Sequence, residues 1–247
     1  MPRREAINSG NLYHVCNRGV DKRNIFLEET DYLRAIHDLF EFNNQNPLKN
    51  GGYFFAKQSS EAGRQYIKDP KEPRKLLVEV LAFCLMPNHF HLLLRQKVEG
   101  GIASFMHKLG TGYAKYFNDK YTRSGSLFQG RFKAVPVKQE SHFLHLPFYI
   151  HLNPLDLVSP EWRERKIINI QKTLAHLESY RWSSHLDYAG IKNFPSVTQR
   201  DYLSRFFESP ALYKTQILNW LQDLQLEGME KVLLEPYKYS DARRHYI

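Results

Sequence analysis

The sequence predicts an α+β fold in which a ferredoxin-like antiparallel sheet carries two helices on one face and is followed by a helical extension. Two observations lead to this prediction. Apolar residues alternate with a period of two in some segments and recur at helical spacing in others. These segments follow one another as strand, helix, strand, strand, helix, strand, which is the ferredoxin-like order. In that order the third strand is internal to the sheet.

The first half of this pattern contains three strands and one helix. Leu12–Arg18 alternates like a strand, and residues 29–43 then carry apolar side chains at helical spacing. Residues 44–75, rich in Asn, Gly, Lys, Pro and Glu, predict an irregular insertion. Residues 76–86 are strongly apolar, a Pro-Asn pair supplies a turn, and residues 89–96 continue as the next strand. We expect a hairpin in the middle of the sheet.

The second half supplies the remaining helix and strand. Gly101–Tyr121 places its apolar residues on one helical stripe, and Ser126–Val137 resumes extended character. A short helix is expected at Ser141–Asn153, after which the chain reads as helical and loop segments. We therefore expect one domain over residues 1–155 and a helical C-terminal extension over residues 156–247.

The composition is that of an ordinary globular protein, with 42% hydrophobic and 25% charged residues. The longest apolar run, Val80–Met86, is too short to span a membrane, and the first residues lack the apolar core of a signal peptide. We expect a soluble, cytoplasmic protein with no membrane partner. Cys16 and Cys84 are too few for a disulfide framework or a thiolate metal site, so both are interpreted as buried thiols.

The net charge of +9 favours an anionic partner, and its distribution is informative. Residues 107–138 contain one acid, Asp119, and seven basic residues: Lys108, Lys115, Lys120, Arg123, Arg131, Lys133 and Lys138. Aromatic residues lie among them: Tyr113, Tyr116, Tyr121, Phe128 and Phe132. Cations for phosphates and flat rings for bases suit single-stranded nucleic acid. A solvated basic helix face above an aromatic core explains the same pattern, and the sequence leaves both interpretations open.

Two histidines on the third strand are the first candidate site residues. Side chains alternate between the faces of a strand, so His89 and His91 point the same way while Phe90 points to the other face. Imidazole binds divalent metals well, and such a pair needs only one or two oxygen ligands to complete an open catalytic site. A His-x-His pattern alone is weak evidence for a metal site, so other residues of the sequence have to support it.

The context is a tyrosine and an asparagine on the last predicted helix. Tyr149 and Asn153 are four residues apart and share a helix face. The amide oxygen of Asn153 can serve as a third, neutral metal ligand, while the phenol of Tyr149 can attack a phosphate that the metal polarises. Pro147 lies inside this helical pattern and either kinks the helix or marks its beginning. The spacing of the pair survives either outcome.

Three motifs in order, MPNHFHLLL (86–94), GSLFQGRFK (125–133) and YIHLNP (149–154), resemble a known family. The chain looks like a REP-associated tyrosine transposase, a single-tyrosine transposase of the HUH class. The resemblance starts at the opening strand and extends to the YRWSS segment at 180–184, about three quarters of the chain. It implies that His89 and His91 are the HUH ligand pair, that Tyr149 is the nucleophile and that Asn153 is the third ligand.

The resemblance implies a DNA transposase that cuts and rejoins single-stranded DNA near hairpins, through a 5′-phosphotyrosine intermediate, with Mg²⁺ or Mn²⁺. The partner would be single-stranded or hairpin DNA, and the protein a monomer or a homodimer. The candidate DNA-binding residues are mostly basic: Arg18, Lys108, Lys115, Arg123, Gln129, Arg131 and Lys133. Arg131 and Lys133 are two apart in a predicted edge strand, so they are expected to face one side.

Two alternatives remain open from the sequence. A domesticated protein would keep the fold and bind hairpin DNA without cutting it, although the intact set of four site residues argues against such decay. A metal-dependent hydrolase would activate water with the two histidines, tolerate the loss of Tyr149 and form no covalent adduct. Tyr113 and Tyr116 are rival nucleophiles by residue type, but neither has an amide or an acid four residues later.

Overall fold

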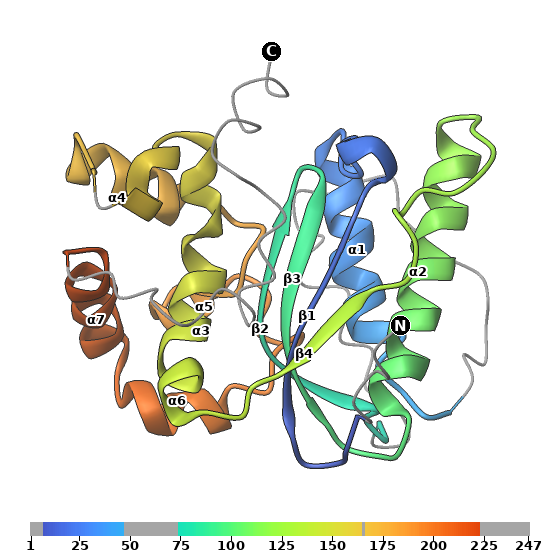
Figure 1. The fold of residues 1–247 in the computed structure, drawn as a ribbon, viewed down its shortest axis with the longest axis horizontal. Helices are drawn as coiled ribbons and strands as arrows, with labels where there is room; N and C mark the ends of the chain where they lie inside the picture. Colours follow the sequence, from blue (N-terminus) through green and yellow to red (C-terminus); the bar gives the residue numbers. More distant parts are fainter. Residues whose placement is uncertain (1–6, 47–73, 165, 223–247) are drawn as a thin grey trace.

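The computed structural model describes residues 7–46, 74–164 and 166–222. Most of the insertion expected at 44–75 therefore lies outside the described residues. The sheet has four antiparallel strands in the order β2-β3-β1-β4 (Figure 1). The strands are β1 (Leu12–Arg18), β2 (Val78–Met86), β3 (His89–Gln96) and β4 (Lys133–Pro136). This is the predicted ferredoxin-like order, with β3 inside the sheet and β4 at its edge, and it confirms the α+β class.

One face of the sheet is covered by α1 (Glu29–Glu41) and α2 (Gly101–Lys120). Alternate strand residues, among them Phe90, Leu92 and Leu94 of β3, pack against these helices in a continuous apolar core. Asp31 joins the two helices, because its buried carboxylate accepts hydrogen bonds from Lys120 Nζ at 2.6 Å and from the hydroxyls of two tyrosines on α2 and just after it. These bonds offset the cost of burying the charge.

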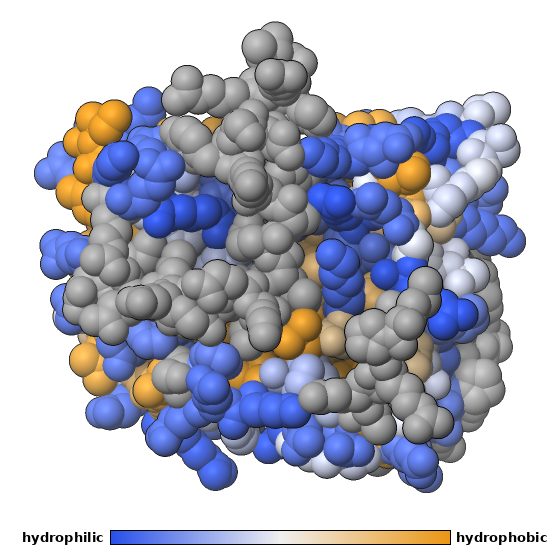
Figure 2. Space-filling model, in the orientation of Figure 1, coloured by the Kyte–Doolittle hydropathy of each residue, from blue (hydrophilic) through white to orange (hydrophobic). Residues whose placement is uncertain are grey.

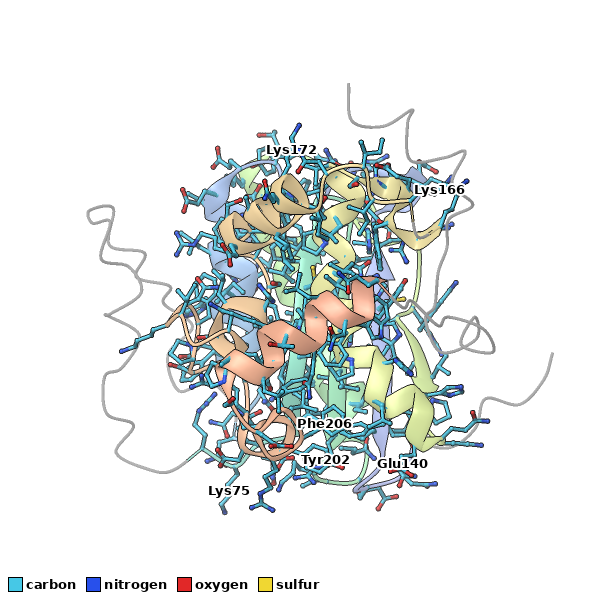
Figure 3. The ribbon with its side chains drawn as sticks, turned by 90° about the vertical axis from the view of Figure 1, so that its left-hand side faces the viewer. Lys75, Glu140, Lys166, Lys172, Tyr202 and Phe206 are labelled. Carbon is cyan, nitrogen blue, oxygen red and sulfur yellow. The ribbon has the colours of Figure 1, made fainter. Side chains whose placement is uncertain are left out.

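The opposite face is covered by α3 (Glu140–Leu152) and by the helices of the C-terminal extension. The chain after α3 contains η2 (Asn153–Leu157), η3 (Pro160–Glu164), α4 (Ile170–Ser179), α5 (His185–Tyr188), α6 (Asp201–Phe207) and α7 (Pro210–Gln222). Figure 3 shows α7 in front, with Lys172 of α4 above it and Tyr202 and Phe206 of α6 below. Apolar residues of α3, α6 and α7 join those of β2 and β3 in a second core. In the described part of the chain, both faces of the sheet are thus covered.

A chain of buried polar side chains ties α3 to the extension. His151 of α3 contacts Ser184 Oγ through Nε2 at 2.7 Å and Tyr213 Oη through Nδ1 at 2.8 Å. The same Tyr213 hydroxyl lies 2.8 Å from His185 Nδ1. All four side chains are at most 3% exposed, so each hydrogen bond satisfies a group that has no access to water. The extension therefore fixes the position of α3 by specific contacts as well as by packing.

The helix around Pro147 begins at Glu140, so the proline does not mark its first turn. The segment 126–137 is extended over a shorter stretch than its sequence pattern predicts, since only Lys133–Pro136 pairs as β4. Both cysteines are buried and free, as predicted. In the described part of the chain, no helix combines the length and the apolar character needed to cross a membrane.

The aromatic residues of the basic segment serve mainly in packing. Tyr113 is 2% exposed and donates its hydroxyl hydrogen to the backbone oxygen of Ile25, and Phe128 is buried in the same core. Tyr116 and Tyr121 donate to Asp31. Phe132 is partly buried against the same core, so all five rings that could have stacked with bases pack within the fold, which favours the core interpretation for them.

Candidate active site

His89 and His91 lie at the start of β3 and point to the face that α3 covers. The strand alternation that buries Phe90 and Leu92 against α1 and α2 sends the two imidazoles to the opposite side. Their ring centroids are 5.0 Å apart, and the side chains are 6% and 1% exposed. The predicted convergence of the two rings is therefore present.

Each imidazole is held through its Nδ1 atom. His91 Nδ1 lies 2.8 Å from His14 Nε2, on the neighbouring strand β1, and His89 Nδ1 lies 2.6 Å from Asn88 Oδ1. Asn88 in turn donates to the backbone oxygen of Lys22. A neutral imidazole with its proton on Nδ1 satisfies both contacts and leaves Nε2 as a lone-pair donor, a tautomer that follows from the hydrogen-bond pattern. Partners of this kind orient metal-binding histidines.

The surroundings keep both rings neutral. Burial lowers the pKa of His89 to about 4, and the nearby Arg163 and Arg18 act in the same direction against the opposing charge of Asp156. Burial also lowers the pKa of His91 well below its usual 6.5. A positive charge on His89 or His14, if either were protonated, would lower it further. Neutral imidazole is the form that coordinates a metal, so the pair needs no deprotonation near neutral pH.

A pocket of about 170 Å³ opens beside the two histidines. Its lining consists mainly of polar and basic residues: Cys16, Asn17, Arg18, His89, His91, Gln129, Arg131 and Lys133. Figure 2 shows hydrophilic residues to the right of the grey atoms, in the region where Figure 1 places the upper ends of the strands. Three cations around two neutral imidazoles make the pocket suitable for an anion such as a backbone phosphate.

The cations come together because the segment before β4 turns back along the end of β1. Gln129 N donates to Arg18 O at 2.9 Å, and the Gln129 side chain accepts a hydrogen bond from Arg18 Nε. Gly130 adopts φ +110°, a conformation that favours glycine. Gly19 also permits a close approach, since a Cβ there would lie 2.2 Å from the backbone oxygen of Arg23. Four predicted DNA-binding residues thereby share one pocket.

Tyr149 and Asn153 lie together on α3 and its C-terminal end, facing an arginine. Arg163 donates from Nη1 to Tyr149 Oη at 2.9 Å and from Nη2 to Asn153 Oδ1 at 3.3 Å. Asn153 also donates from Nδ2 to the backbone oxygen of Tyr149 at 2.8 Å. Both side chains are fully buried. The predicted sharing of one helix face is therefore present.

The tyrosine lies against the histidine cluster. Its ring centroid is 6.1 Å from that of His91 and 6.4 Å from that of His14, with an edge-to-face arrangement in each case. The internal strand β3 and helix α3 thus bring the four residues of the predicted site into one region. Tyr149 and Asn153 are not among the residues that line the basic pocket.

One observation indicates that His89 and His91 suit a divalent metal. His91 Nε2 is buried and has no hydrogen-bond partner among the described residues, so it is a lone pair aimed at no protein group. Those residues contain no group of three or more His, Cys, Asp or Glu side chains placed to hold a metal. A cation bound by His89 and His91 would therefore take its other ligands from oxygen: the Asn153 amide, water or a DNA phosphate.

The remaining candidate DNA-binding residues lie elsewhere. Lys108 and Lys115 belong to α2, on the far side of the sheet from the histidines. Lys108 Nζ donates to the backbone oxygen of Asn44 at 2.7 Å, and Lys115 is exposed. Arg123 donates to Asn118 Oδ1 at 3.1 Å, just after α2. The structure does not bring these three to the basic pocket.

Sequence reasoning missed His14 and Asn88 as supports of the histidine pair, and Arg163 and Asp156 beside the tyrosine. One signal for His14 was available, because its place in the first strand puts it on the same face as Cys16 and Arg18. Arg163 gave no signal of this kind, since it follows Tyr149 by fourteen residues in an irregular segment. Only the packing of η2 and η3 brings it to the phenol.

Comparisons with known proteins bear on this site. Residues 51–153 match the family model described as IS200-like transposase, and the matched segment contains both histidines, Tyr149 and Asn153. A solved structure of a REP-associated tyrosine transposase bound to a REP hairpin aligns with a TM-score of 0.48 and 17% identity, over 78% of this chain and 88% of that one. No match is found among curated proteins. The transposase resemblance indicated by the motifs is confirmed by the family match.

Proposed function

Because the chain carries an IS200-like transposase segment, we propose that it cleaves and rejoins single-stranded DNA at the site formed by β3 and α3. The observation that carries this proposal is the buried ring of Tyr149 against His91, one of two neutral imidazoles that line a basic pocket. Residues 1–155 would supply the chemistry, while the extension from residue 156 would brace α3. The DNA-binding role of Lys108, Lys115 and Arg123 stays a prediction, as do the cytoplasmic location and the monomeric or dimeric state.

The proposed reaction is a phosphoryl transfer to tyrosine. Tyr149 Oη attacks the scissile phosphorus, the bond from phosphorus to the 3′ oxygen breaks, and a 5′-phosphotyrosine and a free 3′-hydroxyl result. The phenol proton is lost and the departing oxygen gains one, so the step is proton-neutral overall. Attack by a 3′-hydroxyl on the phosphotyrosine reverses these changes. Rejoining therefore needs no nucleotide cofactor.

The other residues would prepare the phosphate for this attack. Arg18, Arg131 and Lys133 would hold the DNA backbone in the basic pocket, and Gln129 would keep Arg18 in place. His89 and His91, with Asn153, would bind Mg²⁺ or Mn²⁺, which when present would polarise a non-bridging phosphate oxygen. His14 and Asn88 would orient the two ligands. Single-stranded DNA beside a hairpin is the proposed substrate because the motif resemblance implies it, and the cations of the pocket suit its phosphates.

Covalent capture tests the proposal. Incubation with single-stranded DNA that carries a hairpin and flanking bases, in Mg²⁺ or Mn²⁺, should give a denaturant-resistant adduct at Tyr149. Tyr149→Phe keeps the ring and the packing but removes the nucleophile, so it should retain hairpin binding and lose both adduct and cleavage. Tyr113→Phe is the matched control, because it removes a buried hydroxyl that bonds a backbone oxygen on the other face.

Other outcomes would identify the alternatives. Cleavage that persists in Tyr149→Phe without an adduct would mean a metal-activated water, and hence a hydrolase. Hairpin binding by the unaltered protein without cleavage or adduct would mean a DNA-binding protein that has lost its chemistry. An adduct mapped to Tyr113 or Tyr116 would move the nucleophile to α2 and contradict the proposed site.

A further inference from the structure

Arg163 is the charged group nearest to the hydroxyl of Tyr149 in the described structure. It lies on η3, ten residues beyond the end of the segment that matches the transposase family model. Its Nη1 donates to Tyr149 Oη at 2.9 Å, and its guanidinium carbon lies 5.0 Å from the centroid of the Tyr149 ring. The phenol oxygen thus accepts a hydrogen bond from a cation.

Asp156 and Trp162 fix the position of Arg163. Nε and Nη2 donate to the two carboxylate oxygens of Asp156 at 3.0 and 2.8 Å, a two-point contact that sets the plane of the guanidinium. The guanidinium carbon lies 4.6 Å from the centroid of Trp162. Trp162 itself is fully buried and donates from Nε1 to Asp156 at 2.7 Å. Arg163 therefore meets the tyrosine with little freedom to move.

A structural role alone does not account for this arrangement. Arg163 and Asp156 already satisfy each other, and the Tyr149 hydroxyl could have bonded a backbone oxygen, as Tyr113 does on the other face. The second donor atom of the guanidinium also contacts Asn153, so one cation touches both the predicted nucleophile and the predicted third ligand. The two roles assigned to α3 thus depend on one side chain from the extension.

We propose that Arg163 is a catalytic residue of the transesterification, aligning Tyr149 Oη and stabilising the negative charge that develops on it. This inference rests on the proposed function of Tyr149. As the bond between Oη and phosphorus forms, the phenol proton leaves to solvent and the fixed guanidinium compensates the charge on the oxygen. The bond from phosphorus to the 3′ oxygen breaks, and that oxygen takes up a proton. In the reverse reaction Tyr149 is the leaving group, and the same cation stabilises it.

The test compares variants of Arg163 in the full chain. Arg163→Gln keeps a hydrogen-bond donor on a shorter side chain but removes the charge, and it should slow adduct formation roughly 100-fold in single-turnover measurements, as loss of one transition-state contact does. Arg163→Lys keeps the charge but loses the planar two-point contact, so it should fall between Arg163→Gln and the unaltered protein. Hairpin affinity should stay within about threefold in both, because other cations supply most of the phosphate attraction.

A pH profile separates a catalytic from a purely structural role. If the cation assists loss of the phenol proton, the rate of adduct formation in Arg163→Gln should approach that of the unaltered protein as the pH rises. Hydroxide can then remove the phenol proton without help from the cation. A misplaced tyrosine would give the same deficit at every pH. Arg95→Gln is the matched control, because Arg95 also pairs with a carboxylate, Glu79, and stacks on an aromatic ring, yet lies at the opposite end of β3. Its adduct rate should be unchanged.

The outcomes distinguish this inference from the proposed function. If Tyr149→Phe abolishes the adduct while Arg163→Gln forms it at the normal rate, the nucleophile stands and the catalytic role of Arg163 is overturned. A deficit in Arg163→Gln that is constant with pH, and that Arg163→Lys does not relieve, also overturns it. If the unaltered protein forms no adduct at Tyr149, the proposed function itself fails, whatever Arg163 does.

Discussion

The two faces of one sheet use buried polar groups differently. On the face of α1 and α2, β3 contributes apolar side chains to the centre, and the buried charges lie on the helices. Asp31 accepts hydrogen bonds from Lys120 and Tyr121, and Asp38 pairs with Arg34. On the face of α3, the same strand contributes two histidines, and His14 and Tyr149 lie beside them. Buried polar groups cost stability unless they are paired, so the concentration of imidazoles on the α3 side of the sheet indicates chemistry there.

The buried phenols of the two faces make the same point. The Tyr113 hydroxyl donates a hydrogen bond to the backbone oxygen of Ile25, and this bond links α2 to the loop before α1. Tyr149 receives a hydrogen bond from a guanidinium, which orients its oxygen and places a positive charge beside it. Burial and ring packing are alike in the two cases. The partner of the hydroxyl, rather than its burial, separates a structural tyrosine from a candidate nucleophile.

The largest expected effect comes from the histidines. Replacing both His89 and His91 with alanine should reduce adduct formation at least about 100-fold in Mg²⁺ or Mn²⁺, because the metal ligands are gone. Calorimetric titration with Mn²⁺ should lose its signal, while hairpin affinity measured by gel shift should change little, since the basic pocket remains. Normal cutting by the double variant would show that the polar face of β3 is not a metal site.

A second prediction compares the two faces in stability. Tyr213→Phe removes the hydroxyl that bridges His151 and His185, leaving two buried ring nitrogens without that partner. Tyr113→Phe deprives only one backbone oxygen of its partner. Chemical denaturation should therefore show losses in unfolding free energy of about 2 kcal/mol for Tyr213→Phe and about 1 kcal/mol for Tyr113→Phe. Equal losses would mean that the polar chain behind α3 is no more important than an ordinary buried bond.

The third prediction concerns pH and the same polar chain. Burial lowers the pKa of His185 from 6.5 to about 3. Between these two pH values His185 is protonated in the unfolded chain and neutral in the folded protein. The contribution of His185 to the free energy of unfolding is therefore fully present above pH 6.5 and is lost as the pH drops toward 3. The slope from this group approaches about 1.4 kcal/mol per pH unit.

His185→Gln should remove that share of the slope. Denaturation curves recorded between pH 7 and pH 5 would measure it, and the slope that remains would belong to the other buried histidines. If the variant and the unaltered protein show the same slope, His185 does not resist protonation in the fold, and the polar chain behind α3 would tolerate a charge.

The sequence by itself determined the order of strands and helices and the local geometry of the site residues. His89 and His91 share a face because strand side chains alternate, and Tyr149 and Asn153 share one because helical residues four apart are neighbours. These relations depend only on backbone periodicity. The motif resemblance was equally local, since it rested on short runs of residues. The single-tyrosine transposase prediction therefore needed no tertiary information.

Only the tertiary structure decided which distant groups complete the site. His14 meets His91 through the pairing of β1 with β3, and Gln129 meets Arg18 because a turn folds back on β1. Arg163 reaches Tyr149 because short helices after α3 return along it. The basic segment, which the sequence left open as a DNA-binding surface or a solvated helix face, is divided between α2 and the pocket. Such contacts join residues far apart in the chain, and they are set by how whole elements pack, which spacing within a segment does not record.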